Sequence, residues 1–484
     1  MTNVKAKIYG TFFASIFLSL YPGAVFSADT PWLVPVYSLL LGGNSGPSIK
    51  LVKDINPGVG DSDSEELFVF NNLLYFGATD GVYGNEVWTS DGTMAGTSLL
   101  KDINVGSGDS NSYTTYYTIG WNREFTAMNG VLFFTATDGN HPVTLWKSDG
   151  TSGGTSEVNS NVTPGHLIVF KDELYFSGTQ GVGEFENTEL WKSDGTEEGT
   201  ILVKDISENY SSYPGGEGGF TVFNNELYFS VANTNTNTSP ELCQLWKTDG
   251  TEGGTVAVKP GTALVTASEI AVCNNSLYFM ADDGSGNELW KSDGSSDGTV
   301  MLSEKNFIAT PQSFTEYNGA LYFTADDGLS GSELWKLACS TDNTITKVKD
   351  INPGNVDSNP QLMTVFNNLL YFRAINVNSG EELWRSNGTE SGTILVKDIN
   401  PGPEDSSPQG FTAYNGVFYI SADDGVHGDE LWSSDGTEAG TKLLKDINPG
   451  PDSSYPYDFT VMNDTLFFTA EDSINGWELW KLQE

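Results

Sequence analysis

The stretch "ELWKSDGTEEGT", Glu189 to Thr200, is a clear copy of a phrase that returns along the whole chain. It places a tryptophan two residues before a Ser-Asp-Gly-Thr sequence. In such a sequence Asp can accept backbone N–H bonds and Gly can adopt a positive φ. A large aromatic residue followed by a tight turn predicts a β-strand that buries its tryptophan and then reverses into the next strand. We interpret the phrase as a structural repeat whose tryptophan packs between neighbouring sheets.

The phrase occurs nine times, with successive tryptophans 44 to 58 residues apart. Its copies contain Trp88, Trp146, Trp191, Trp246, Trp290, Trp335, Trp384, Trp432 and Trp480. Two copies depart from the pattern, because "KLACSTDN" follows Trp335 and Asn387 replaces the turn Asp. A period of this length is typical of propeller blades and kelch-type repeats.

Each unit contains four short β-rich runs, as the segment from Phe411 to Gly450 shows. The runs "FTAYN" and "VFYISA" flank Asn415-Gly416, which predicts a hairpin with a tight turn. The runs "DELWSS" and "TKLLKDI" provide a third and a fourth strand. No segment shows sustained helical periodicity. The sequence therefore predicts an all-β fold, a single closed β-propeller of about nine four-stranded blades.

The two ends of the repeat region complement each other. The last copy stops at "ELWKLQE" and lacks a fourth strand, whereas "IKLVKDINPG" from Ile49 is a fourth strand with no preceding three. We expect this N-terminal strand to complete the last blade, because that pairing closes the ring and covers two exposed sheet edges. The propeller is thus assigned to residues 49–484.

The N-terminus is typical of a secretory signal peptide, which we assign to residues 1–27. Lys5 and Lys7 precede an apolar run, and Val25 and Ser27 suit the positions before a cleavage site. Residues 28–48 then form a linker. A membrane anchor is the alternative, and the break in the apolar run at Pro22-Gly23 argues against it. After signal removal no stretch is long and apolar enough to predict a transmembrane helix.

The charge and the cysteines limit the partners and the cross-links. With 23 basic and 64 acidic residues the formal net charge is −41, which disfavours nucleic acid and anionic membranes as partners. Three cysteines cannot form a complete disulfide framework. A Cys243–Cys273 bridge is one possibility. The alternative is that Cys273, which stands where other repeats carry Phe, is a small buried apolar residue.

Acidic loops suggest a calcium site. The sequences "ADDG" and "KDINPG" recur where the loops between strands two and three and between blades are expected. Carboxylate and carbonyl oxygens are the ligands that Ca²⁺ prefers. The candidate ligands are Asp282, Asp283, Asp326, Asp327, Asp423 and Asp424. The alternative is that these carboxylates only stabilise turns and make one face of the propeller acidic.

The most irregular part of the repeat region lies at the second and third blades. An expanded loop from Gly106 to Phe125 carries a group of aromatic and basic residues, which are Tyr113, Tyr116, Tyr117, Trp121 and Arg123. His141 and His166 fall in neighbouring loops. Aromatic rings could stack on sugars, and an arginine could pair with a uronate or sulfate. His141, His166 and Arg123 could instead catalyse base-assisted polysaccharide elimination. The remaining alternative is a long loop that packs on its own blade.

The repeated phrase resembles the bacterial ELWxxDGT repeat family over about Ile49 to Glu484, and more weakly resembles kelch repeats. The resemblance implies a secreted or surface-exposed propeller-like protein. It also implies carbohydrate contact, because repeats of this family accompany polysaccharide-degrading enzymes in some exported proteins. It supplies no catalytic residues.

We therefore expect a secreted, cell-surface or periplasmic acidic propeller that acts as a binding or interaction module. Its expected partner is a polysaccharide or another surface macromolecule. One alternative is a propeller polysaccharide lyase or hydrolase with its site at blades 2 and 3. Another is a purely structural surface or matrix protein.

Overall fold

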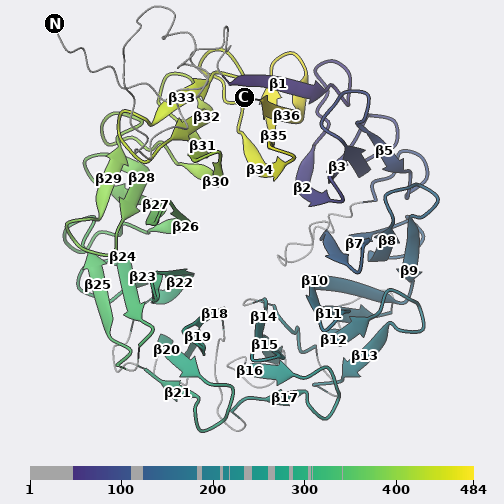
Figure 1. Cartoon of the computed structure of the whole chain (residues 1–484), viewed down its shortest axis with the longest axis horizontal. Coiled ribbons are helices and arrows are strands. Elements are labelled where there is room, and N and C mark those ends of the chain that lie inside the picture. Colours follow the sequence, from purple (N-terminus) through teal and green to yellow (C-terminus); the bar gives the residue numbers. More distant parts are fainter. Residues whose placement is uncertain are drawn as a thin grey trace, which may run out of the picture. The chain divides into compact units, whose positions relative to one another are not determined.

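The computed structural model describes residues 47–110, 124–181, 188–207, 211–216, 219–233, 242–259, 268–282, 287–302, 307, 309–340 and 342–483. These residues form thirty-six β-strands, and none of them lies in a helix. The strands build nine four-stranded antiparallel sheets that follow one another around a ring (Figure 1). The predicted nine-bladed propeller is confirmed, and residues Ile49–Leu482 form one compact unit.

The blades follow the chain, and the first four contain these strands: blade 1, β2 (Glu65–Phe70), β3 (Leu73–Ala78), β4 (Glu86–Ser90) and β5 (Ser98–Lys101); blade 2, β6 (Thr126–Met128), β7 (Val131–Ala136), β8 (Thr144–Ser148) and β9 (Ser156–Asn159); blade 3, β10 (Val162–Phe170), β11 (Glu173–Gln180), β12 (Thr188–Ser193) and β13 (Ile201–Lys204); blade 4, β14 (Phe220–Phe223), β15 (Glu226–Asn233), β16 (Leu242–Thr248) and β17 (Val256–Ala257).

The other five blades contain these strands: blade 5, β18 (Ser268–Cys273), β19 (Ser276–Asp282), β20 (Asn287–Ser292) and β21 (Val300–Met301); blade 6, β22 (Ala309–Tyr317), β23 (Ala320–Asp326), β24 (Ser332–Ala338) and β25 (Ile345–Lys349); blade 7, β26 (Gln361–Phe366), β27 (Leu369–Asn376), β28 (Gly380–Ser386) and β29 (Ile394–Lys397); blade 8, β30 (Gln409–Tyr414), β31 (Val417–Asp423), β32 (Asp429–Ser434) and β33 (Lys442–Lys445); blade 9, β34 (Tyr457–Met462), β35 (Thr465–Asp472), β36 (Gly476–Gln483) and β1 (Ser48–Lys53).

The first strand of each blade lies at the centre of the ring and the fourth at its outer edge (Figure 1). Because neighbouring strands are antiparallel, the connections between strands one and two and between strands three and four share one face. We call it the short-turn face. The connections between strands two and three and between consecutive blades share the opposite face. We call that one the long-loop face.

The repeated tryptophan lies between neighbouring blades, as predicted. Trp88 of blade 1 is in a core cluster with Phe76 of its own blade and with Val52, Met462 and Leu479 of blade 9. Eight of the nine repeat tryptophans are at most 8% exposed, and Trp246 is partly buried. Burial of such a large aromatic side chain makes each blade interface a hydrophobic core.

Lysines then join each blade to the next. Lys481 of blade 9 donates from Nζ to the carbonyl of Gly92 in blade 1 at 2.7 Å. Lys53, in the same blade, donates to the carbonyl of Thr97 at 2.8 Å and lies 5.4 Å from the centroid of Trp88. The same contacts recur in other blade pairs: Lys147–Gly195, Lys247–Gly294, Lys336–Gly388, Lys101–Thr155, Lys259–Thr299, Lys349–Thr393 and Lys397–Thr441.

The Ser-Asp-Gly-Thr turn is held by its own side chains. Asp194 Oδ1 accepts the backbone N–H of Thr196 at 2.8 Å and its hydroxyl at 2.7 Å. Gly195 has φ 88°, and a Cβ there would lie 2.8 Å from the ring of Phe133 in the preceding blade. Asn387 makes the same bonds to Thr389. The turn therefore needs an acceptor oxygen rather than a charge.

The glutamate that precedes the repeated Leu-Trp is buried and fully engaged. The carboxylate of Glu382 accepts the backbone N–H groups of Ile399 at 2.9 Å and Asn400 at 3.2 Å, and the hydroxyl of Ser406 at 2.7 Å. Burial raises the pKa of this carboxyl to about 7, although the hydrogen bonds act in the opposite direction. The pKa is raised to about 7 in the same way in Glu189, Glu333, Glu430 and Glu478.

The chain termini close the ring as predicted. Strand β1 pairs with β36 and completes blade 9 (Figure 1). Glu478 accepts the backbone N–H groups of Ile55 at 3.0 Å and Asn56 at 3.1 Å, so the segment after β1 also satisfies a buried carboxylate. Loss of this segment would expose a sheet edge and leave that carboxylate without its donors.

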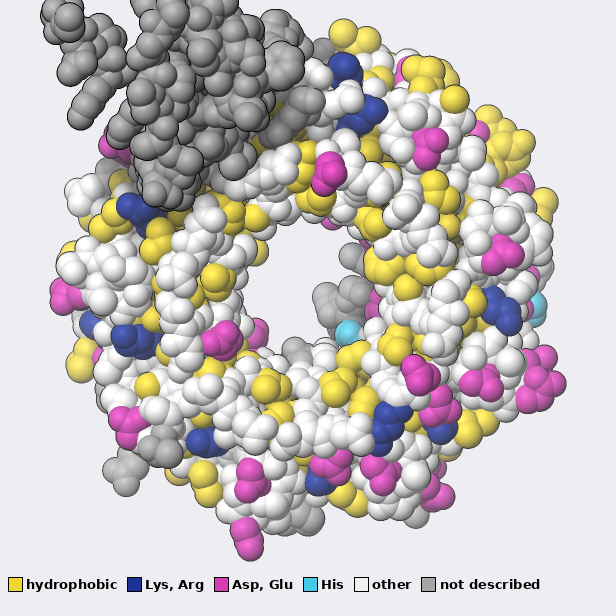
Figure 2. Space-filling model, viewed as in Figure 1, with side chains coloured by type: hydrophobic (Ala, Val, Ile, Leu, Met, Phe, Trp, Pro, Cys, Tyr) yellow, Lys and Arg dark blue, Asp and Glu magenta, His cyan; other side chains and the backbone are white. Residues whose placement is uncertain are grey.

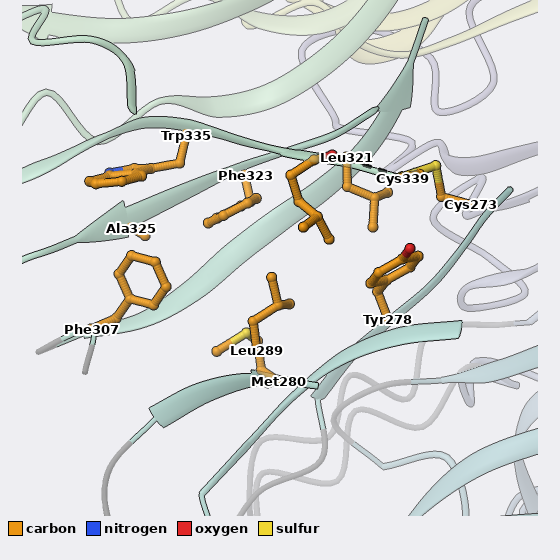
Figure 3. Close-up of a cluster of buried hydrophobic side chains, with 11 residues drawn as sticks. Cys273, Tyr278, Met280, Leu289, Phe307, Leu321, Phe323, Ala325, Trp335 and Cys339 are labelled. Atoms are coloured by element: carbon orange, nitrogen blue, oxygen red, sulfur yellow. Dashed lines mark hydrogen bonds between the residues drawn. A yellow bond between two sulfur atoms is a disulfide. The ribbon is translucent and has the colours of Figure 1, made fainter. Parts of the chain in front are cut away.

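The disulfide differs from the predicted pair. Cys273 in β18 of blade 5 is bonded to Cys339, directly after β24 of blade 6 (Figure 3). The predicted Cys243–Cys273 bridge is wrong, and so is the reduced Cys273 alternative, although Cys273 is indeed buried. Cys339 lies in the divergent copy after Trp335, and there a covalent bond joins two blades where other copies have Ser-Asp-Gly-Thr.

We predict that deletion of residues 49–58 lowers the melting temperature and causes aggregation, because blade 9 loses its outer strand and Glu478 loses two donors. Thermal unfolding and light scattering would measure both effects. Deletion of the preceding linker, residues 28–46, is the control and should change neither. If the protein without residues 49–58 melts and stays soluble like the intact chain, ring closure by β1 does not stabilise the fold.

We predict that Cys273→Ser combined with Cys339→Ser lowers the free energy of unfolding by about 2–4 kcal/mol, since the bond closes a loop with a sequence separation of 66 residues. Chemical denaturation would measure the difference. Reduction of the intact protein should give a similar decrease, and Cys243→Ser should give none. An equal effect of Cys243→Ser would contradict the pairing.

The pH dependence of stability should have a maximum at about pH 4, between the ordinary pKa values of the two kinds of group, 3.8 for aspartate and 4.5 for glutamate. The raised glutamate pKa values mean that the folded state binds these protons more tightly. The contribution of these glutamates to stability is complete below their ordinary pKa of 4.5, and it is lost as the pH rises through their folded-state pKa of about 7. The turn aspartates behave in the opposite sense. The hydroxyl of Thr196 lowers the pKa of Asp194, so its contribution is lost as the pH falls below 3.8.

Thermal unfolding between pH 3 and pH 8 would measure this profile. High salt should screen repulsion between exposed carboxylates and leave the contribution of the buried glutamates. A melting temperature that does not fall between pH 5 and pH 8 at high salt would contradict the assignment.

Candidate functional site

Hydrogen bonds between neighbouring loops hold the long-loop face in place. In the loop between blades 1 and 2, the side-chain amide of Asn104 donates to the carbonyl of Asp109 at 2.8 Å. Asp109 Oδ1 in turn accepts the backbone N–H of Asn85 from the loop between β3 and β4 at 2.8 Å. In the same way the side-chain amides of Asn56, Asn352 and Asn400 donate to the carbonyls of Asp61, Asp357 and Asp405. The carboxylates of these aspartates accept the backbone N–H groups of Trp477, Ser332 and Glu381. The face is therefore preorganised for contact with a partner.

Charge is distributed unequally between the two faces. The described loops 54–64, 79–85, 102–110, 137–143, 327–331, 350–360, 377–379, 398–408, 424–428, 446–456 and 473–475 contain no lysine or arginine. All of these except 377–379 and 473–475 contain carboxylates. The lysines that join the blades instead donate to carbonyls at the short-turn face, such as that of Gly92. Figure 2 shows Asp and Glu side chains together with Lys and Arg side chains on the face of the ring in view and along its rim.

The candidate calcium ligands that the structure describes stabilise their own turns. Asp326 Oδ1 accepts the N–H of Gly328 at 2.7 Å, and Asp327 Oδ1 accepts that of Leu329 at 3.1 Å. Asp423 and Asp424 make equivalent bonds in blade 8. No group of three or more His, Cys, Asp or Glu side chains within the described residues is placed to hold a metal ion. Asp283 and the side chain of Asp282 lie outside the description. Calcium at these loops stays a prediction.

The two candidate histidines occupy different parts of blades 2 and 3. His141 lies in the loop between β7 and β8, and its Nδ1 is 3.2 Å from a carboxylate oxygen of Asp138. His166 lies within β10, the innermost strand of blade 3. The loop position predicted for His166 is therefore wrong. Pro164 and Gly165 suggested a loop, but β10 is an edge strand, and there proline is tolerated and pairs with β11.

The other members of the predicted sugar site lie outside the described residues. They are Tyr113, Tyr116, Tyr117, Trp121 and Arg123. In the described part of blades 2 and 3, the backbone N–H of His166 donates to Glu124 at 2.7 Å and the ring of His141 contacts Asp138. These contacts do not bring the two histidines together. The ligand site at blades 2 and 3 stays a prediction.

Carboxylates link blades around the centre of the ring, an arrangement that the sequence did not reveal. Inner strands carry a residue with positive φ, such as Glu66 and His166. Asp458 of blade 9 accepts the N–H of Glu66 in blade 1 at 2.6 Å, and Glu124 of blade 2 accepts that of His166 in blade 3. The strands β2, β10 and β34, which carry Glu66, His166 and Asp458, are the innermost strands of their blades (Figure 1). A register shift between the first and second strands of the blade coincides with the positive φ at Glu66 in β2 and at His166 in β10, and no fixed sequence motif marks these positions.

A second aromatic group lies where blade 9 meets blade 1. The rings of Tyr457 in β34 and Trp477 in β36 have centroids 5.2 Å apart and planes at 46°. Both are half-buried, and both donate to the carbonyl of Ser64, at 3.4 and 3.3 Å respectively. Tyr455, which is 52% exposed, lies two residues before Tyr457. We call Tyr455, Tyr457 and Trp477 the seam aromatics.

Trp477 is outside the repeat pattern. Where blade 9 has Trp477, blades 1, 6, 7 and 8 have Asn85, Ser332, Glu381 and Asp429. The sequence signal for this residue is a tryptophan at a position that is polar in those four blades. It is easily counted as part of the repeat, because it lies three residues before the repeat residue Trp480. Its position next to the loop that enters blade 1 sets it apart from the core tryptophans.

Carboxylates surround the seam aromatics. Burial raises the pKa of Tyr457, and the nearby Asp458, Glu65 and Glu66 raise it further. Burial and Glu65 likewise raise the pKa of Asp458, while its hydrogen bonds lower it. Aromatic rings beside carboxylates can stack on the apolar face of a sugar while the carboxylates accept its hydroxyl groups. The seam therefore has the chemical groups of a saccharide site.

Comparisons with known proteins identify no family. No family model matches the chain, and no curated protein matches it. Similar solved structures include a prolyl endopeptidase, with 12% identity and a TM-score of 0.40 over 72% of this chain and 54% of that one. A puromycin hydrolase has 12% identity and a TM-score of 0.38 over 76% and 60%, and prolyl oligopeptidase B from Galerina marginata has 10% and 0.41 over 72% and 55%.

The chain spans little more than half the length of these structures, and at such identities the likeness concerns the fold alone. Within the described residues there is no helix long and apolar enough to cross a membrane. A β-propeller with a preorganised loop face supports a binding or interaction module in general.

Proposed function

We propose that the protein is an exported binding module that recognises a saccharide of a surface macromolecule at the seam aromatics. The observation that carries the proposal is the pairing of Trp477 with Tyr457 at a position where other blades have polar side chains. The repeat tryptophans already fill the blade interfaces, and Trp477 is additional to them. Its half-buried ring leaves surface that a ligand can cover.

The charge around the seam favours a neutral or cationic saccharide. Several carboxylates lie near one another here. Burial raises the pKa of Asp63, and Asp61 and then Glu65 raise it further; burial also raises the pKa of Asp458, and Glu65 adds to this. A uronate or sulfate would be repelled here. Binding of an acidic sugar would depend on Arg123, which lies outside the described residues.

Export is part of the proposal. The chain begins with a sequence typical of a signal peptide, and a disulfide joins blades 5 and 6. Such bonds persist in oxidising compartments. A strongly acidic surface also favours solubility outside the cell.

We make no catalytic proposal. A polysaccharide lyase would need a base and an acid that converge on one sugar, and no described contact joins His141 to His166. A purely structural role remains the outcome if the seam binds nothing.

We predict that Trp477→Ser lowers saccharide affinity about tenfold or more, because an aromatic anchor is lost from the site. The wild-type protein, residues 28–484, would first be screened on a glycan array, and the bound glycans would then be titrated against the variant by calorimetry. Serine is chosen because blade 6 has Ser332 at this position, so the fold should be retained.

Two further variants separate binding from folding. Tyr455→Ala should also weaken binding without lowering the melting temperature. Trp191→Ala should destabilise the fold by about 3–5 kcal/mol, since it removes a core aromatic. Unchanged glycan affinity of Trp477→Ser would contradict the seam site.

A further inference from the structure

Five consecutive blades carry an exposed aliphatic residue at the same place on the long-loop face. It lies at the apex of the loop between strands two and three in blades 6, 7, 8, 9 and 1. The residues are Leu329, Val377, Val426, Ile474 and Val82, between 61% and 77% exposed. We call them the aliphatic tips. A single exposed aliphatic residue is ordinary, but its recurrence at the same loop position in five consecutive blades is not.

Each tip is fixed before any partner binds. The backbone N–H of Leu329 donates to Asp327 Oδ1 at 3.1 Å, and that of Val426 donates to Asp424 Oδ1 at 3.0 Å. Val82 and Ile474 are held in the same way by an aspartate of their own loop. Val377 donates instead to Asn352 of the loop between blades 6 and 7 at 3.1 Å. A tip held in this manner loses little conformational entropy on binding.

The loop does not require an aliphatic residue. Blade 2 has Asn140 at the equivalent position, and its backbone N–H donates to Asp138 Oδ1 at 2.9 Å in the same turn. A polar residue therefore forms this turn equally well. The aliphatic side chains of the other five blades have no role in the turn itself, and their exposure needs another explanation.

The surroundings of the tips are rich in carboxylates. The basic groups beside them are paired with carboxylates: the ring of His427, next to Val426, lies 2.8 Å from Asp424, and Nζ of Lys347 lies 3.8 Å from Asp350. The described loops on both sides contribute carboxylates, such as those of Asp61, Asp405 and Asp452, and no lysine or arginine. Val59 and Val356, in the loops between blades, extend the apolar area. A surface of rigid aliphatic groups among carboxylates is complementary to apolar groups among cations.

We propose that the aliphatic tips form a docking surface for a basic polypeptide that presents apolar side chains between its lysines or arginines. This inference goes beyond the saccharide site at the seam and does not depend on it. One apolar side chain of the partner would contact each blade, and its cations would pair with the carboxylates between the tips.

Other occupants fit the surface less well. A second copy of the chain would bring its own acidic face, and the net charge of −41 opposes that contact. An anionic lipid surface is repelled for the same reason. A saccharide would find no Tyr, Trp or Phe to stack on in the described tip loops of blades 6, 7 and 8, and in blade 1 only Tyr83, next to Val82, is available.

The test uses residues 28–484 and two synthetic peptides of equal charge, one alternating lysine with leucine and one alternating lysine with serine. Calorimetry should show tighter binding of the lysine-leucine peptide. Leu329→Asn, Val377→Asn and Val426→Asn together should reduce its affinity about tenfold or more, to the level of the lysine-serine peptide. These substitutions copy Asn140, lie in blades 6 to 8, and leave the seam aromatics unchanged.

A matched variant, Met94→Asn with Ile201→Asn and Val300→Asn, removes three exposed apolar residues away from the long-loop face and should bind like wild type. Equal affinity of the triple tip variant and wild type for the lysine-leucine peptide would overturn the proposal. So would equal affinity of both peptides, which would indicate charge alone. Loss of dimers in the tip variant by ultracentrifugation would assign the surface to a second copy, and loss of glycan binding there would assign it to a saccharide.

Discussion

The contact between one blade and the next determines the rest of this structure. A tryptophan of each blade is packed against the preceding sheet, and lysines of that sheet donate to carbonyls of the next turn. Because every contact joins residues at fixed positions of two copies, a change in one copy would require a change in its neighbour. This coupling explains why the phrase from Glu189 to Thr200 recurs with so little variation in its Trp, Asp, Gly and Thr.

In a closed ring every blade contacts two neighbours, so closure of the ring contributes more to stability than any single blade. Stability in a repeat protein is the sum of units and of interfaces between neighbours. An open ring would lose one complete interface and expose two sheet edges. Strand β1 prevents this by pairing with β36, and the loop after it supplies donors to Glu478. The disulfide strengthens the interface between blades 5 and 6, where the copy after Trp335 lacks the usual turn.

Local pattern was enough to predict the architecture but not the contacts between distant loops. The period, the Asn-Gly hairpins and the spare strand at Ile49 predicted nine blades and their closure, because each signal lies within a few residues. The pairing of Cys273 with Cys339 depends on which strand ends meet across an interface. His166 was assigned to a loop because Pro164 and Gly165 suggested one, although edge strands accept both. Trp477 was overlooked because it lies beside a repeat tryptophan.

The difference in charge between the short-turn face and the long-loop face follows from the same contacts between blades. Lysines and turn residues of the repeat are engaged at the short-turn face. Most described loops of the long-loop face contain carboxylates and no lysine or arginine, and Lys259 between blades 4 and 5 is an exception. Many of these carboxylates accept backbone N–H groups of their own loops, as Asp327 and Asp424 do, so they cannot be replaced without loosening the loops. The positions that can vary are those whose side chain accepts no backbone N–H group of the loop. They include Asn140 of blade 2, Val426 of blade 8 and Trp477 of blade 9. Specificity for a partner can therefore change there, blade by blade, while the ring and the charge of the face stay constant.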